Sequence, residues 1–337
     1  MVTAGAGPQR RPPRWPSRLR RVGVTIAVVL AVLLASGAVV QAVLTARDGR
    51  ANPAPGRLIN VGGHRLHLYC TGTGSPTVVL EAALLGTSSE WAWVQGAVAR
   101  TTRVCSYDRA GYAWSAPGPG PRDAKHIAAE LHRLLRAAGI GGPYVLVGHS
   151  MGGVYVREYA ALYAPSVAGM VLVDAASPDQ WTRIPGYSLA STRQQADLAP
   201  LLARFGIMRL WTQSLAAGLP ARARRAATAF YGATWTWETD AAEVDALPAT
   251  DAEVQADSTS LGALPLEVVT AGGQEFSAAQ ERVWQQLQRE LAGLSRNGHQ
   301  HTIAGATHLS LVFDRRGSEP TVAAILQVVR AARERRA

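Results

Sequence analysis

A serine stands between glycines near the middle of this chain of 337 residues, where residues 148–152 (GHSMG) fit the pattern G-x-S-x-G. The apolar run "YVLV" precedes the pattern, and helix-like spacing follows it. A serine on a sharp strand-to-helix turn has a strained backbone and presents its hydroxyl clear of the sheet. The backbone N–H of Met151 then points at the negative oxygen that develops when Ser150 attacks a carbonyl. The pattern predicts a nucleophilic serine; a serine that only caps a helix is the alternative.

Strands and helices alternate along the chain on both sides of this serine. A hairpin with a Gly-Gly turn is expected first, at 58–72. A buried type of strand is then expected at 76–84, further strands at 101–111, 142–150, 167–177 and 264–273, and a short strand and turn at 299–308. Helices are expected at 123–140, 152–163, 278–294 and 319–335. This alternation predicts an α/β protein, with a mostly parallel sheet and helices on both faces. Residues 177–262 interrupt it with helical, Trp-bearing segments and are interpreted as an inserted cap.

The N-terminal part divides into three segments: a basic, Pro-rich stretch at 1–21 that we expect to be disordered, an uncharged stretch at 22–46, and a linker at 47–57. The uncharged stretch is long enough to cross the hydrocarbon core of a bilayer, about 30 Å. We favour a membrane anchor over a removed signal, although residues 40–42 and 44–46 resemble cleavage sites. Both interpretations place residues 58–337 outside the cytoplasm, because the arginine cluster stays inside.

The formal net charge of +10 does not indicate a nucleic-acid partner, because of where the charge lies. Arginines are concentrated before residue 22, where no acidic residue occurs, and lie beside the predicted membrane segment. No Cys/His cluster has the spacing of a zinc site, and neither a dinucleotide-binding loop nor a phosphate-binding loop follows a strand. We therefore expect no metal and no cofactor.

Three motifs resemble the α/β-hydrolase superfamily, specifically its lipase- and esterase-like members with a helical cap. They are "GHSMGG" at 148–153, "YDRAGYAWS" at 107–115 and "GATHLSL" at 305–311. The resemblance runs from about residue 58 to the C-terminus. It implies an eight-stranded type of sheet, a catalytic triad in the order nucleophile, acid, histidine, and a small ester-like substrate with an apolar part.

The resemblance assigns the base to His308, which follows the last predicted strand and precedes the last helix. The other seven histidines fit less well: His299 and His301 alternate in a strand, and His149 is expected to pack or to line the pocket. The acid is open between two strand ends. Asp174 ends the strand 167–177 and is favoured; Glu275 follows the strand 264–273 and is the alternative.

The oxyanion hole departs from the superfamily's pattern, because Glu81, Ala82, Ala83 and Leu84 stand where a His-Gly pair is usual. The backbone N–H of Ala83 can still join that of Met151 as a donor, since donation needs no side chain. The role of Glu81 is open; it pairs with Arg109 or bonds to a loop. Within "YDRAGYAWS", Asp108 and Arg109 are interpreted as structural.

The resemblance also makes the second and fourth strands neighbours, which brings Cys70 close to Cys105. Outside the cytoplasm a structural disulfide between them is expected. Four tryptophans in the cap either bury it against the core or line an apolar pocket: Trp181, Trp211, Trp235 and Trp237.

The function that these residues indicate is that of a serine hydrolase acting on an ester through an acyl-enzyme. Thioester, amide, peptide or C–C bond cleavage and perhydrolysis use the same residues. A non-catalytic binding protein on the same scaffold is the alternative from another class. An aspartate nucleophile, as in epoxide hydrolases and haloalkane dehalogenases of this fold, is disfavoured by Ser150.

Overall fold

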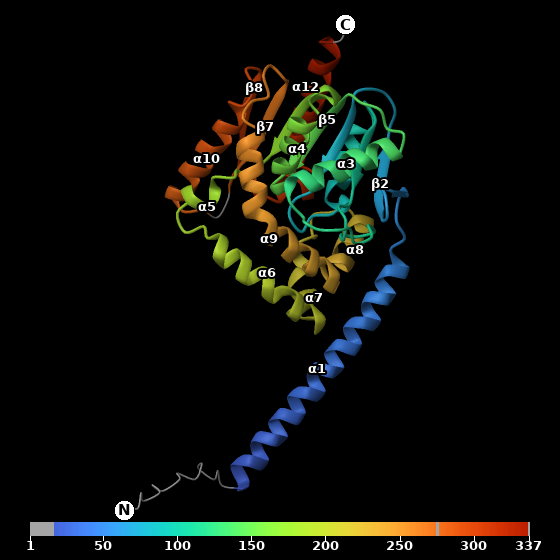
Figure 1. The fold of residues 1–337 in the computed structure, drawn as a ribbon, viewed down its shortest axis with the longest axis vertical. Helices are drawn as coiled ribbons and strands as arrows, with labels where there is room; N and C mark the ends of the chain where they lie inside the picture. Colours follow the sequence, from blue (N-terminus) through green and yellow to red (C-terminus); the bar gives the residue numbers. More distant parts are fainter. Residues whose placement is uncertain (1–16, 274–275, 336–337) are drawn as a thin grey trace, which may run out of the picture.

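The computed structural model describes residues 17–273 and 276–335. One long helix, α1 (Ser17–Ala51), extends away from an α/β body (Figure 1). This helix is long and apolar enough to cross a membrane, by length and composition. It also continues past the predicted apolar segment, so the connection to the first strand is shorter than the predicted linker at 47–57 and occupies 52–56. Residues 1–16, part of the predicted basic segment, lie outside the described residues.

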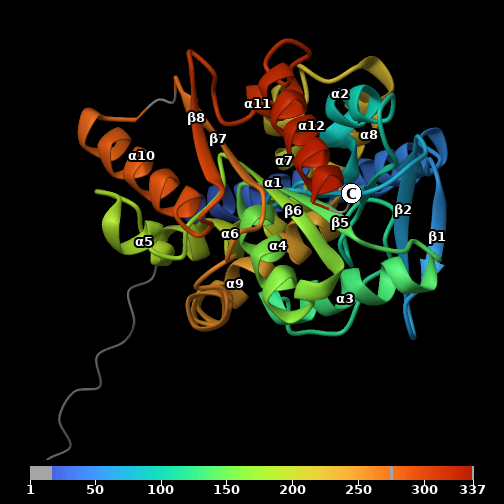
Figure 2. The ribbon, with the colours of Figure 1, turned by 90° about the horizontal axis from the view of Figure 1, so that it is seen from above.

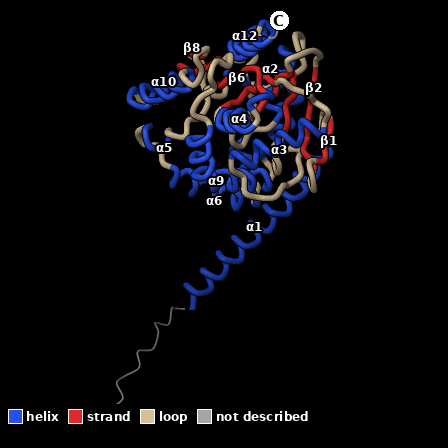
Figure 3. Tube along the Cα trace, turned by 45° about the horizontal axis from the view of Figure 1, so that its top comes forward, coloured by secondary structure: helices blue, strands red, loops and turns tan. Residues whose placement is uncertain are grey.

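The body is built on an eight-stranded sheet, as the resemblance implies (Figure 3). Its order is β1-β2-β4-β3-β5-β6-β7-β8; β1, β2 and β4 pair antiparallel, and every other neighbouring pair is parallel. The strands are β1 (Arg57–Asn60), β2 (Arg65–Thr71), β3 (Thr77–Glu81), β4 (Val104–Tyr107), β5 (Tyr144–His149), β6 (Val167–Val173), β7 (Leu266–Gly272) and β8 (Gly298–Ala304).

Helices cover both faces of this sheet, because the central strands alternate buried apolar side chains between two cores (Figure 2). One face packs against α2 (Ala92–Val98) and α12 (Glu319–Glu334). The other packs against α3 (Ala124–Ala137), α4 (Met151–Leu162) and α10 (Ala278–Ala292). Along β5, for example, Val145 and Val147 belong to the first core and Leu146 to the second. The predicted α/β class is confirmed.

The segment between β6 and β7 carries the helices predicted for an inserted cap. They are α5 (Gln180–Arg183), α6 (Leu189–Arg204), α7 (Ile207–Trp211), α8 (Ala221–Tyr231) and α9 (Thr234–Asp257). The cap tryptophans differ in burial: Trp237 is buried, whereas Trp211 and Trp235 are exposed on the surface. Burial against the core therefore accounts for only part of this set.

Cys70 and Cys105 lie directly opposite each other in the β2–β4 pair and form a disulfide, as predicted. The bond joins the antiparallel edge of the sheet to its parallel centre.

Candidate active site

Ser150 lies on the turn between β5 and α4, with a backbone φ of 54°. A positive φ costs a residue with a side chain on the order of 1–3 kcal/mol, so the surroundings must hold it. The Ser150 N–H donates to the Val173 carbonyl of β6 over 3.1 Å. The Ser150 carbonyl accepts from the N–H groups of Gly153 and Ala176, at 3.0 and 2.9 Å. Backbone bonds to β6 and α4 thus fix the strained turn.

The two glycines of the pattern are required by close backbone contacts. A Cβ on Gly148 would lie 2.4 Å from the Gly152 carbonyl oxygen, and a Cβ on Gly152 would lie 2.4 Å from the Glu81 carbonyl oxygen. Both distances are too short for any side chain. The spacing G-x-S-x-G is therefore explained by the space available at this turn.

His308, after β8, contacts Asp174, after β6. Its Nδ1 lies 2.6 Å from Asp174 Oδ2; the His308 side chain is one-third exposed, whereas Asp174 is fully buried. The other carboxylate oxygen, Oδ1, accepts from the Ala271 N–H of β7 and from the Trp284 Nε1–H of α10, each at 3.0 Å. The orientation of the carboxylate is therefore set by the neighbouring strand and by a helix. Glu275, the alternative acid, lies outside the described residues.

His308 packs against His149, the residue directly before Ser150 in the chain. The rings of His149 and His308 lie 4.6 Å apart between centroids, and His149 Nε2 is 3.2 Å from the His308 backbone oxygen. His149 thus packs at the site, as expected. His299 and His301 lie on β8 and pair with Glu267 of β7, their ring nitrogens 3.4 and 2.6 Å from the Glu267 carboxylate.

The Met151 N–H opens α4, where the first turn leaves its N–H groups without an acceptor in the helix. The N–H of Ala83, the second predicted donor, is engaged by Glu90, whose Oε1 lies 3.2 Å away. Glu81 has other hydrogen-bond partners. Its carboxylate accepts from Arg109 Nη1 at 2.9 Å and from the Tyr107 hydroxyl, which settles its open role in favour of pairing with Arg109.

Arg109 holds the loop after β3 in place, which supports its structural interpretation. Its Nη1 and Nη2 donate to the carbonyls of Ala82 and Ala83 at 2.8 and 2.9 Å, and its Nε donates to Glu243 of α9 at 2.8 Å. One guanidinium therefore ties the predicted oxyanion loop to the cap.

Glu90 is the residue at this site that sequence reasoning missed. It is buried in the short helical turn Ser88–Trp91, and its Oε1 lies 3.3 Å from His149 Nδ1. Burial raises the pKa of Glu90 to about 8, against the opposing effects of the Ala83 N–H, Arg109 and His308. Burial also lowers the pKa of His149 to about 3, with a smaller contribution from His308.

The hydrogen bonds around His149 indicate that Glu90 is protonated. The His308 backbone oxygen only accepts, so neutral His149 carries its proton on Nε2 and offers a lone pair on Nδ1. Glu90 must then donate to Nδ1 in its neutral form. The other ionisable groups that influence its carboxyl are Asp108, Arg109, His308 and Tyr231. Glu90 is the only acidic residue between Glu81 and Asp108 in the sequence, and that was the one available signal.

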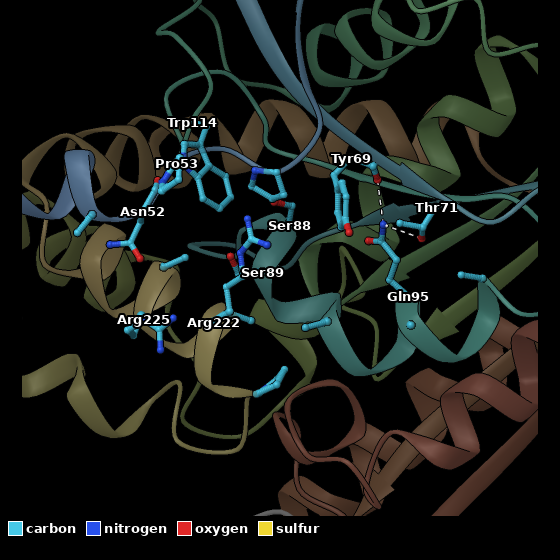
Figure 4. Close-up of a pocket in the computed structure, with 18 residues that line it drawn as sticks. Asn52, Pro53, Tyr69, Thr71, Ser88, Ser89, Gln95, Trp114, Arg222 and Arg225 are labelled. Atoms are coloured by element: carbon cyan, nitrogen blue, oxygen red, sulfur yellow. Dashed lines mark hydrogen bonds between the residues drawn. The ribbon is translucent and has the colours of Figure 1, made fainter.

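The described part of the chain holds no group of three or more His, Cys, Asp and Glu side chains arranged for a metal ion. A cavity of about 570 Å³ lies between the end of α1, β2 and α8 (Figure 4). Ser88 and Ser89 line it, together with Arg222 and Arg225 of α8, whereas Ser150, Asp174 and His308 do not. This cavity is therefore distinct from the Ser150 site.

Three curated relatives match parts of the chain. They are efuK of Hormonema carpetanum, described as a probable transporter (35% identical, 38% of this chain and 20% of the relative), an uncharacterized protein of Schizosaccharomyces pombe (32%, 49% and 37%) and an AB hydrolase superfamily protein of Gibberella zeae (36%, 30% and 32%). The chain thus spans well under half the length of these relatives.

Solved structures match most of the chain at low identity. The Cif epoxide hydrolase from Acinetobacter nosocomialis has a TM-score of 0.68 at 12% identity, over 86% of this chain and 96% of that one. An esterase from Thermogutta terrifontis has a TM-score of 0.60 at 20% identity, over 82% and 98%. These likenesses concern the fold. The sequence model for the alpha/beta hydrolase fold matches residues 76–245, half of the chain, and the chain therefore belongs to the alpha/beta hydrolase family.

Proposed function

We propose that this protein is a serine hydrolase that cleaves carboxylic esters, with Ser150 as nucleophile, His308 as base and Asp174 as acid. The observation that carries the proposal is the strained Ser150 turn beside the His308–Asp174 pair at the same end of the sheet. Asp174 holds Nδ1 of His308 protonated, so that Nε2 is the basic nitrogen.

In the acylation step His308 Nε2 takes the proton of the Ser150 hydroxyl as the oxygen attacks the ester carbonyl carbon. The carbonyl oxygen becomes negative and is stabilised by the N–H of Met151. The N–H of Ala83 stabilises it as well once that N–H is released from its hydrogen bond to Glu90. The tetrahedral intermediate collapses, the ester C–O bond breaks, and the alcohol leaves with the proton from His308. The acyl group stays on Ser150.

Deacylation repeats these steps with water. His308 removes a proton from the water molecule, the hydroxide attacks the acyl carbon, and the acid is released as Ser150 regains its proton. Met151 belongs to an apolar cluster against which Leu84 and Trp181 pack partly exposed, which favours an ester with an apolar part. Other acyl transfer, peptide or C–C cleavage and perhydrolysis would use the same groups.

The proposed hydrolase domain comprises residues 58–337, with its cap at about 177–262, and it acts outside the cytoplasm, held to a membrane by α1. The uncharged run within α1, the arginines that precede it and the Cys70–Cys105 disulfide support this location. Resistance of the full chain to alkaline extraction from membranes tests the anchor. Release of a shortened chain that begins after residue 46 would instead identify a cleaved signal.

The decisive experiment measures p-nitrophenyl ester turnover and fluorophosphonate labelling of the full chain, beside Ser150→Ala and the matched control Ser191→Ala on the cap surface. We expect wild type and Ser191→Ala to turn over ester and to be labelled, and Ser150→Ala to do neither. A folded wild type that hydrolyses no ester and resists the probe would overturn the proposal and leave a binding protein on this scaffold as the better account.

A further inference from the structure

The cap carries large apolar side chains on its surface, and they are concentrated on α6, α7 and the start of α9. Leu210 is 75% exposed and Trp211 67% exposed. Side chains of this size are unfavourable in water, so a cluster of them marks a surface that meets another apolar phase. We call this set the cap edge: Leu198, Leu201, Ile207, Leu210, Trp211 and Trp235.

The cap edge lies beside the C-terminal half of α1, and specific contacts fix the two relative to each other (Figure 1). At Gly37 the helix approaches so closely that an added Cβ would lie 3.2 Å from the Phe205 carbonyl oxygen. The side chain of Gln41 is buried and donates to the Gly232 carbonyl over 2.5 Å. Arg209 of α7 donates to Gln41 Oε1 at 3.1 Å and pairs with Asp48 at 2.5 Å.

The length of α1 places these contacts within the depth of a bilayer. The uncharged run begins at Val22, and residues 22–36, before the contact at Gly37, span about 22 Å of helix. The hydrocarbon core is about 30 Å thick. The free part of the helix is therefore too short, and a crossing must include the part that packs against the cap.

The amide of Gln41 supports this depth. An amide is costly in hydrocarbon unless it is hydrogen-bonded, and here both ends are paired with the cap. The α1 side chains of Val39, Val40 and Val43 also remain exposed, in the part of the helix that packs against the cap. The two tryptophans of the cap edge are of the type enriched at membrane–water boundaries.

We propose that the cap edge inserts into the boundary between headgroups and acyl chains of the leaflet that faces the hydrolase domain. The proposal rests on membrane anchoring by α1, and its occupant is bilayer lipid. Lipid is favoured over a second copy of the chain, because the part of α1 that contacts the cap must itself lie in the bilayer for the helix to cross it.

Site-directed fluorescence tests this insertion without using enzymatic activity, so its outcome is independent of the proposed hydrolysis. Both native cysteines are in the disulfide, so a single introduced thiol can be labelled with an environment-sensitive fluorophore. The full chain is reconstituted into phosphatidylcholine vesicles as Leu210→Cys, as Val32→Cys in the free part of α1, or as Leu162→Cys. Leu162 is a matched control, because it is 42% exposed and ends α4 at the opposite end of the sheet from Ser150.

We expect the labels at positions 210 and 32 to be quenched by a nitroxide lipid and shielded from aqueous iodide. A nitroxide near the headgroup should quench the label at 210 most strongly, and the label at 162 should respond to iodide alone. A label at 210 that behaves like that at 162 would overturn the insertion. Shielding of position 210 from both quenchers would assign the cap edge to a protein contact, and iodide quenching at position 32 would overturn the anchor itself.

Discussion

Two histidine–aspartate pairs in this molecule have nearly the same bond and very different surroundings. The Nδ1–Oδ2 distance is 2.6 Å between His308 and Asp174 and 2.7 Å between His67 and Asp108. His308 is one-third exposed near Ser150, whereas His67 and Asp108 are both fully buried. The second ring nitrogen of His67 is held by the Pro55 carbonyl, in the segment that follows α1.

The difference shows that the bond alone does not make a catalytic pair. A histidine acts as a base only if its second nitrogen reaches the proton to be removed. His67 cannot, because a backbone oxygen takes that position. Burial opposes the charged form of His67, but Asp108 and the Pro55 carbonyl outweigh it, so the pKa of His67 is raised. The buried pair thus joins β2 and β4 to the segment after α1.

The strongest test of this contrast is His308→Ala. We expect kcat for ester hydrolysis to fall on the order of 10⁵-fold, because the base is lost, while the melting temperature changes little. His126→Ala is the matched control, since His126 is exposed and pairs with Asp123 at 2.7 Å, far from Ser150. A loss of less than about tenfold would mean that the exposed pair is no more catalytic than the buried one.

Asp174→Asn should have the next largest effect, a fall in kcat of about 10⁴-fold. An amide nitrogen in place of Oδ2 cannot accept from Nδ1, so His308 adopts the tautomer that leaves Nε2 protonated. Glu275→Gln is the matched comparison and should change kcat by less than about twofold. The opposite ranking, measured with variants of equal melting temperature, would assign the acid to Glu275.

The pairing of His308 with Asp174 was expected from the family resemblance, which rests on local patterns at strand ends, and the structure contains this contact. The glycines around Ser150 indicate backbone crowding. Asp174 follows the apolar strand β6, and His308 was assigned by its place after the last strand, as the resemblance implies. The Cys70–Cys105 pairing was expected because the resemblance makes the second and fourth strands neighbours, and the structure contains the bond.

Features that depend on packing between distant segments were not predictable. Glu90 precedes Trp91 in an unremarkable turn, and only the fold brings it to Ala83 and His149. The contact between Gln41 and Gly232 likewise joins segments far apart in the chain. Trp211 and Trp237 share a composition signal in the cap, yet one is exposed and the other buried. Residue type indicates which groups are apolar; tertiary contacts decide which surface they face.

Asp108→Asn tests the buried pair and should affect stability instead of turnover. It removes the charge opposite His67 and weakens the bond from the Ser88 N–H to Asp108 Oδ1, which measures 2.6 Å. We expect the free energy of unfolding to fall by about 3 kcal/mol, with kcat within about threefold of wild type below the melting temperature.

The pH dependence of Asp108→Asn sharpens this test. Because the folded pKa of His67 is raised, the stabilisation by the pair is fully present below the unfolded pKa and declines as pH rises through the folded one. The stability difference between wild type and Asp108→Asn should therefore shrink as pH rises above the ordinary histidine range. Chemical denaturation at a series of pH values measures it, and a difference that grows with pH would contradict the assigned charge state.

Another histidine–carboxyl pair, Glu90 with His149, lies between these extremes, since it is buried yet contacts the His308 site through His149. With a pKa of about 8, Glu90 is neutral at pH 7 and donates to His149. Above that pH it becomes a carboxylate 3.2 Å from the Ala83 N–H, where the negative oxygen of the intermediate requires a donor. We expect wild-type kcat/KM to decline by about tenfold between pH 7 and pH 10, a cost of about 1.4 kcal/mol in the transition state.

Glu90→Gln should abolish this decline, because an amide is neutral at every pH and keeps a donor toward His149. The raised pKa also means that folded wild type binds more protons than the unfolded chain, so its stability falls as pH rises from the ordinary glutamate range to about 8. The stability of Glu90→Gln should not fall in this way as pH rises. Glu158→Gln, which replaces a buried acid in α4 with a pKa raised to about 7, is the control and should keep the wild-type activity profile. If kcat/KM of Glu90→Gln still declines at alkaline pH, the Glu90 carboxyl does not oppose the oxyanion. The Glu90–His149 pair would then be structural, like the pair of His67 with Asp108.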